Sequence, residues 1–126
     1  MTRLTDDQID RAKISANLRN PIHEHNDCIR MAYEWLDAQN VIKIVREEDW
    51  KHIIERWCGR YISDDDVRVA ASMHPKISGK HPKYNISSRL VLPSSMRLKG
   101  IGESGKQNQI MRVGSGGRYK SIESDR

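Results

Sequence analysis

The side chains that most clearly predict a chemical role are the lysines and arginines of the C-terminal half. Residues 1–75 contain 11 Lys+Arg and 14 Asp+Glu, a net charge of −3, whereas residues 76–126 contain 11 Lys+Arg and 3 Asp+Glu, a net charge of +8. Lys and Arg attract phosphate independently of base sequence. The asymmetry therefore indicates contact with a polyanion, nucleic acid first and a membrane surface second. A solvated basic tail is the alternative.

The cations that could contact phosphates are spaced through Gly, Ser and Asn. Glycine lets a backbone approach closely, and Ser, Asn and backbone amides can donate to phosphate oxygens. Tyr84 and Tyr119 lie among these cations and could stack on an exposed base, although an inward position in a strand is the favoured alternative for Tyr84. We expect the contacts at Arg68, His74, Lys76, Lys80, Lys83, Arg89, Arg97, Lys99, Lys106 and Arg112, with Arg118 and Lys120 continuing the series.

Other patterns favour neither a metal site nor an enzyme. In the segment HEHND, His23 and Asp27 lie at i and i+4 and so share a helix face, but two such residues make a weak metal site. The segment GIGESGK at residues 100–106 has the Gly and Lys spacing of a phosphate-binding loop but lacks its final Ser/Thr. Cys28 and Cys58 belong to no CxxC pair, which favours buried thiols. We therefore predict no catalytic residue, no metal and no cofactor.

Residues 46–73 predict two consecutive helices at the centre of the scaffold. Gly59 suits the left-handed conformation that often ends a helix. Ser63 can then cap a second helix, whose first turn contains three aspartates. Two helices joined in this way are typical of a helix-turn-helix. The apolar residues of the first of these helices recur at the spacing of one helix face, at Trp50, Ile53, Ile54, Trp57, Cys58 and Tyr61.

The remaining elements follow from caps and apolar periodicity. Residues 1–19 predict a first helix, and residues 22–40 predict a core helix with Asn20 as its N-cap and Pro21 as its first residue. The β-branched residues 41–45 predict a strand that pairs with a later one. Residues 114–126 have too little apolar content to fold alone and predict a flexible basic tail. Further strands are expected at residues 85–92, in part of 94–105, and at 109–113.

The order of two helices, a short strand, two helices and a basic hairpin resembles the winged helix-turn-helix superfamily of DNA-binding domains. In this resemblance residues 63–73 form the recognition helix and the later strands form the wing. The resemblance covers roughly residues 20–113. The expected fold is α+β and mostly helical, with four N-terminal helices, a short strand and a C-terminal β-hairpin that is winged-helix-like, and we expect residues 1–113 to form one globular domain. Asp64, Asp65 and Asp66 depart from the family pattern, because a recognition helix presents its first turn to DNA and phosphates repel carboxylates.

Length and composition complete the expectation. A chain of 126 residues, 37% hydrophobic and 31% charged, fits one domain that needs no disulfide or metal. No apolar run approaches the roughly 18 residues of a membrane span, and no signal peptide is visible, so we predict a cytoplasmic protein with no membrane partner. We expect a DNA-binding regulator or accessory factor that acts as a homodimer. The alternative is a protein-interaction module, an inhibitor or adaptor, whose basic face docks on an acidic partner.

Overall fold

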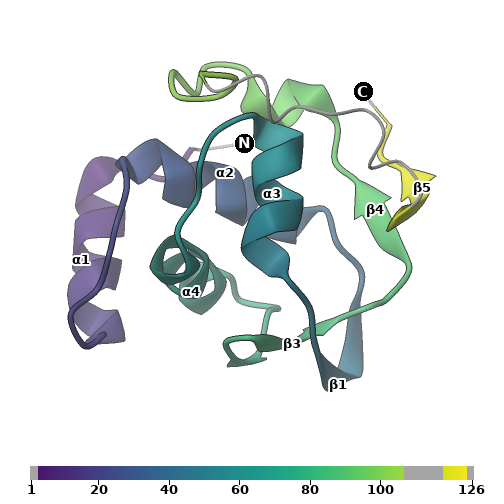
Figure 1. Ribbon diagram of the computed structural model, residues 1–126, viewed down its shortest axis with the longest axis horizontal. Helices are drawn as coiled ribbons and strands as arrows, with labels where there is room; N and C mark the ends of the chain where they lie inside the picture. The colour runs from purple at the N-terminus through teal and green to yellow at the C-terminus, as the bar shows by residue number, and fades with distance from the viewer. Residues whose placement is uncertain (1–2, 107–117, 125–126) are drawn as a thin grey trace.

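The computed structural model describes residues 3–106 and 118–124, and these residues form an α+β domain with four α-helices and several short strands. The helices occupy one side of the molecule and its centre, while the strands form two small sheets at its lower and right-hand edges (Figure 1). In chain order the elements are α1 (Asp6–Ala16), α2 (Asn26–Asp37), β1 (Val41–Glu47), α3 (Trp50–Cys58), α4 (Asp64–Met73), β2 (Gly79–Lys80), β3 (Lys83–Ile86), β4 (Leu90–Leu92), the 3-10 helix η1 (Ser95–Leu98) and β5 (Tyr119–Ile122).

The predicted cap at Ser63 and the predicted helix end at Gly59 are confirmed, and α1 begins with a cap of the same kind as α4. Thr5 accepts from the amide of Gln8 at the start of α1, and Ser63 accepts from the amide of Asp66 at the start of α4, each within a capping box. Gly59 ends α3 with a φ of 69°, the left-handed conformation expected of it. These signals involve residues only three or four positions apart, which is why the sequence shows them without knowledge of the fold.

The core is built around α2, which packs against α1, α3 and α4. Trp35 of α2 and Trp50 of α3 are fully buried, and their rings meet edge to face at 6.2 Å between centroids. Trp57 is 9% exposed and donates from Nε1 to the carbonyl of Pro93, 3.2 Å away. The predicted apolar face of α3 therefore points into the core from Trp50 to Cys58. The prediction is wrong for Tyr61, which lies beyond the end of the helix and is 38% exposed. Among the described residues, no helix is both long and apolar enough to span a bilayer.

The start of the second predicted helix is wrong by about one turn. Helix α2 begins at Asn26 with His25 as its N-cap, so Asn20 is not a cap and Pro21 is not helical. The reason is a tertiary contact, because the amide of Ile22 donates to Asp65 and its carbonyl accepts from the hydroxyl of Ser63. This segment is thus held against the start of α4 in an irregular conformation.

The β-branched run pairs with a later strand, as predicted. Strand β1 lies antiparallel to β3, and β3 pairs with β2 in a hairpin, so the strand order is β1-β3-β2. The register pairs Val41 with Ile86 and Arg46 with Tyr84, so four residues of β1 lie opposite one residue of β3. Residues 42–45 therefore project from the sheet, and we call them the β1 knob. In Figure 1, β1 bends sharply at the lower edge of the molecule, beside β3.

The predicted strand at residues 85–92 is two strands in different sheets. Strand β3 ends at Ile86, and β4 begins at Leu90 and runs parallel to β5. Residues 95–98, expected to be part of a strand, form η1 instead. Residues 119–122, which the sequence assigns to a flexible tail, form β5, and the hydroxyl of Tyr119 accepts from Nε1 of Trp35 at 3.1 Å. The predicted strand at residues 109–113 lies outside the described residues.

Candidate nucleic-acid interface

Arg97, one of the predicted phosphate contacts, is instead the centre of an ionic network inside the domain. Its Nε and Nη2 atoms donate to the two carboxylate oxygens of Glu123, both at 2.6 Å, and Nη1 donates to Glu34 at 2.8 Å and Asp37 at 3.0 Å. Hydrogen bonding to Arg97 lowers the pKa of Glu123, and bonds from His74 and Arg97 lower the pKa of Asp37 against the opposing effect of burial. This guanidinium ties the end of β5 to α2 and is not available to a phosphate.

Three more predicted contacts are engaged by carboxylates of the chain itself. His74 is buried, its Nε2 lies 2.8 Å from Asp37, and its Nδ1 accepts from the amide of Lys76. Arg68 pairs with Asp65 at 2.7 Å, one turn earlier on α4. Lys106 pairs with Glu103 at 3.3 Å. The fold therefore uses part of the predicted contact charge internally.

The remaining predicted cations that lie within residues 3–106 are exposed, and they form no ion pair with any described residue. Four of them lie on or beside the β2–β3 hairpin: Lys76, Lys80, Lys83 and Arg89. Lys99 follows η1, the green helix at the top of Figure 1, and is far from the hairpin at the lower edge. Arg112 lies outside the described residues. Of the two cations that continue the series, Arg118 pairs with Glu48 at 3.2 Å and Lys120 is exposed on β5.

The hairpin holds its lysines in place through contacts with α3 and α4. Lys80 and Lys83 are cross-strand partners on either side of a two-residue turn, His81 and Pro82. The carbonyl of Pro82 accepts from Nε1 of Trp50 at 2.7 Å, and Nε2 of His81 lies 3.2 Å from Asp64 at the start of α4. The turn is therefore anchored on its inner side, while the two lysines face solvent.

Tyr84 anchors the hairpin from within and is not available for base stacking. Its side chain is 3% exposed, its ring lies 6.0 Å from that of Trp50, and its hydroxyl lies 3.1 Å from Nδ1 of His81. Burial raises the pKa of Tyr84 and, together with the nearby Arg68, lowers the pKa of His81. The inward position weighed for Tyr84 is confirmed, and Tyr119 is likewise occupied by its bond from Trp35.

A cleft of about 510 Å³ opens between the hairpin turn and the start of α4. We call it the acidic cleft, because four of its lining residues carry carboxylates. Helix α4 contributes Asp64 and Arg68, and most of its remaining surface is covered by α1, α2 and α3. No local pattern in the sequence brings residues 47–49 together with residue 64. The lining residues are Glu47, Glu48, Asp49, Trp50, Asp64, Arg68, His81 and Pro82.

The β1 knob is a surface that the sequence prediction did not anticipate. Its apolar side chains are exposed by 37% at Ile42, 69% at Ile44 and 46% at Val45, and Lys43 is exposed between them. A β-branched run normally indicates a half-buried strand. Here β1 has three residues more than β3 between the two pairs, and this excess pushes the run out of the sheet, which no property of the run itself predicts.

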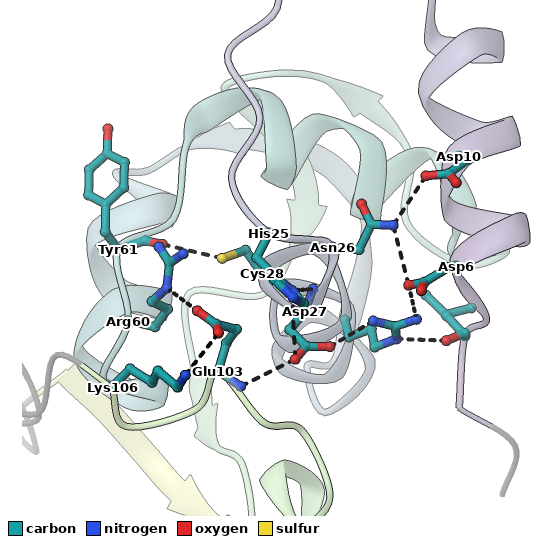
Figure 2. Close-up of polar contacts among 12 residues, drawn as sticks. Asp6, Asp10, His25, Asn26, Asp27, Cys28, Arg60, Tyr61, Glu103 and Lys106 are labelled. Atoms are coloured by element: carbon teal, nitrogen blue, oxygen red, sulfur yellow. Dashed lines mark hydrogen bonds and ion pairs between the residues drawn. The ribbon is translucent and has the colours of Figure 1, made fainter.

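The HEHND segment and the glycine-rich loop stabilise the fold (Figure 2). His23 lies 3.0 Å from Asp66, whereas Asp27 pairs with Arg30 and accepts from the amide of Glu103, so the two residues do not converge on a metal. Within residues 3–106 and 118–124, no three His, Cys, Asp or Glu side chains gather as a metal site would require.

The amides of the glycine-rich loop are used within the chain. Besides the Glu103 amide, Gly105 donates to the carbonyl of Cys58 at 2.7 Å, so the loop does not present these donors to a phosphate.

No family model, curated protein or solved structure matches this chain.

The thiol of Cys28 contacts the carbonyl of Tyr61 at 3.5 Å, and burial raises the pKa of both Cys28 and Cys58 to about 12. Both cysteines are buried free thiols, as predicted.

Proposed function

We propose that this chain is a nucleic-acid-binding protein, with DNA as the favoured ligand, that contacts phosphates through the β2–β3 hairpin. The observation that carries the proposal is the placement of unpaired cations. Lys80 and Lys83 face each other across the hairpin, with Lys76 shortly before it and Arg89 shortly after it. Each of these side chains is exposed and forms no ion pair with the described residues. A ligand phosphate would therefore displace only water and counterions from them.

We also propose that α2 to β3 form a winged-helix unit in which the hairpin is the wing. Support comes from the order α2, β1, α3, α4, β2, β3 together with the strand order β1-β3-β2. Strand β1, which lies between α2 and α3, thus pairs with β3, the second strand of the hairpin. In this arrangement the hairpin turn lies beside the start of α4, where His81 contacts Asp64.

In this proposal α4 does not read bases from a major groove. Its first turn carries Asp64, Asp65 and Asp66, and its one described cation, Arg68, is paired with Asp65. Carboxylates at this position would meet phosphates on either side of a groove and repel them. Contacts limited to lysines and arginine on the sugar-phosphate backbone position a protein but carry little sequence information. We therefore expect binding with weak preference among DNA sequences.

A salt titration tests the proposal. The affinity for a fluorescently labelled 20-base-pair duplex, measured by anisotropy between about 20 and 200 mM NaCl, should fall along a log–log line with a slope of roughly −3 to −4, as expected for about four neutralised phosphates. A second duplex of shuffled sequence should give a similar affinity. Absence of binding to duplex or single-stranded DNA at the lowest salt would remove the proposal and favour a protein-interaction module.

A further inference from the structure

The β1 knob is a preformed projection whose base is held by Arg46. The guanidinium of Arg46, which directly follows the knob, donates to the carbonyl of Ile86 at the end of β3, at 2.8 Å, and to that of Ser87, the next residue, at 3.0 Å. The same guanidinium lies over the ring of Trp50, 5.2 Å from its centroid. The knob is therefore fixed in an orientation that exposes aliphatic side chains, which is costly in water unless another surface covers them.

The charges of the knob and the acidic cleft are complementary. Lys43 is the one charged side chain of the knob, whereas the cleft presents four carboxylates against the guanidinium of Arg68 and the half-buried His81. Glu48 is already paired with Arg46 and Arg118. Asp49 is paired with His52 and Asp64 with His81. Glu47 is exposed and, among the described residues, is the one carboxylate of the cleft without an ion pair, so we take it as the partner of an incoming lysine.

The two surfaces lie at the same end of the molecule but cannot meet within one chain. The knob ends at Val45, and the cleft is lined by Glu47 and the residues that directly follow it. The single residue between them, Arg46, is too short a connection for the chain to reverse and place the knob in its own cleft. A second copy related by a two-fold axis could instead bury each knob in the opposite cleft, because an isologous interface repeats every contact.

From this geometry we propose that the chain forms a homodimer in which the β1 knob of each copy docks in the acidic cleft of the other. Ile42 and Ile44 lose their exposed surface in the interface, and Lys43 pairs with Glu47 of the second copy. The knob is small beside the roughly 1,600 Å² of a standard stable interface. We therefore expect a weak dimer, with a dissociation constant of roughly 1–100 μM.

A charge-complementation experiment tests this interface in the absence of nucleic acid. Sedimentation equilibrium from about 1 to 500 μM, a range that spans the expected dissociation constant, should show the unmodified protein passing from monomer to dimer. Lys43→Glu alone and Glu47→Lys alone should each weaken dimerisation at least about tenfold, because each places like charges at both contacts. An equimolar mixture of the two variants should dimerise again. In the mixed dimer one contact pairs Glu with Lys in the reversed sense and the other is native.

Two further variants separate this interface from a general effect of charge. Lys99→Glu changes the net charge by the same amount as Lys43→Glu, but at an exposed site far from the knob, and it should leave dimerisation unchanged. Ile44→Asp removes the most exposed apolar side chain of the knob and should yield a monomer with an unchanged circular dichroism spectrum. An unmodified protein that stays monomeric throughout the range, or a mixture no more dimeric than its separate components, would overturn the proposal.

Discussion

Replacing Arg97 by Met should destabilise the domain strongly while sparing its proposed ligand surface. The change keeps an unbranched side chain of similar length but removes the charge and all four bonds to Glu123, Glu34 and Asp37. The side chain of Glu34 is 7% exposed, so its carboxylate would remain buried with Arg3, at 3.2 Å, as its remaining salt-bridge partner among the described residues. Removing one partner of a buried ion pair costs about 3–5 kcal/mol, because the other charge is left uncompensated.

The lower end of this range applies to Arg97→Met. Asp37 and Glu123 are 31% and 26% exposed, so water can solvate part of the charge that the guanidinium now compensates. We therefore expect the free energy of unfolding to fall by about 3 kcal/mol and the melting temperature to fall by roughly 10–15 °C for a domain of this size. Urea unfolding followed by tryptophan fluorescence measures the first quantity, and thermal circular dichroism measures the second.

The pH dependence of the same variant gives a second readout. The pKa values of Asp37 and Glu123 are lowered in the folded state, so their contribution to stability is fully present above their unfolded values of about 4. It is lost as the pH falls through the folded values. The difference between the unmodified protein and Arg97→Met should therefore be largest near pH 7 and shrink below about pH 4. A loss under about 1 kcal/mol at pH 7, or one that does not depend on pH, would refute the assignment of this network.

Two further substitutions and one labelling experiment test the fold. Gly79→Ala should prevent correct formation of the hairpin, because the φ of Gly79 is 117° and an added Cβ would lie 2.1 Å from the carbonyl oxygen of Lys83; normal melting would contradict this geometry. Cys28 and Cys58, whose pKa values burial raises to about 12, should react with a thiol reagent at pH 8 only after urea is added, and rapid labelling of the native protein would show that they are accessible. Trp57→Ala should lower the free energy of unfolding by about 3–5 kcal/mol through the cavity it leaves, whereas a near-neutral result would place Trp57 on the surface.

Features set by neighbouring residues could be predicted from the sequence. The caps at Thr5 and Ser63 and the left-handed turn at Gly59 each depend on side chains within one turn of a helix. The burial of Trp50 and Trp57 follows from apolar spacing along α3. The mixed α and β class and the pairing of the β-branched run with a later strand were also predictable, because composition and element order indicate both.

Features set by distant partners could not be predicted. A helical start at Pro21 fits local preferences, but contacts with Ser63 and Asp65 hold this segment in another conformation. The run at residues 85–92 has the alternation of one strand, and its division depends on β1 and β5 being available as separate partners.

The candidate site shows the same limit. Arg97 and Lys83 look alike as isolated cations in a basic stretch. Arg97, however, meets Glu34 and Asp37 across more than 50 positions, while Lys83 projects from a hairpin into solvent. Charge composition located the basic half of the chain, but only the fold shows which of its charges are available to a ligand.

The most direct test of the nucleic-acid proposal is the affinity of Lys80→Glu/Lys83→Glu for a DNA duplex at about 50 mM NaCl, compared with the matched double reversal Lys99→Glu/Lys120→Glu. Both variants change the net charge equally and alter exposed side chains. The hairpin variant should bind at least about 30-fold more weakly and show a salt slope nearer zero by about two units, because two phosphate contacts are lost. The matched variant should bind within about threefold of the unmodified protein. Equal losses in the two variants, or none in the hairpin variant, would contradict binding through the hairpin.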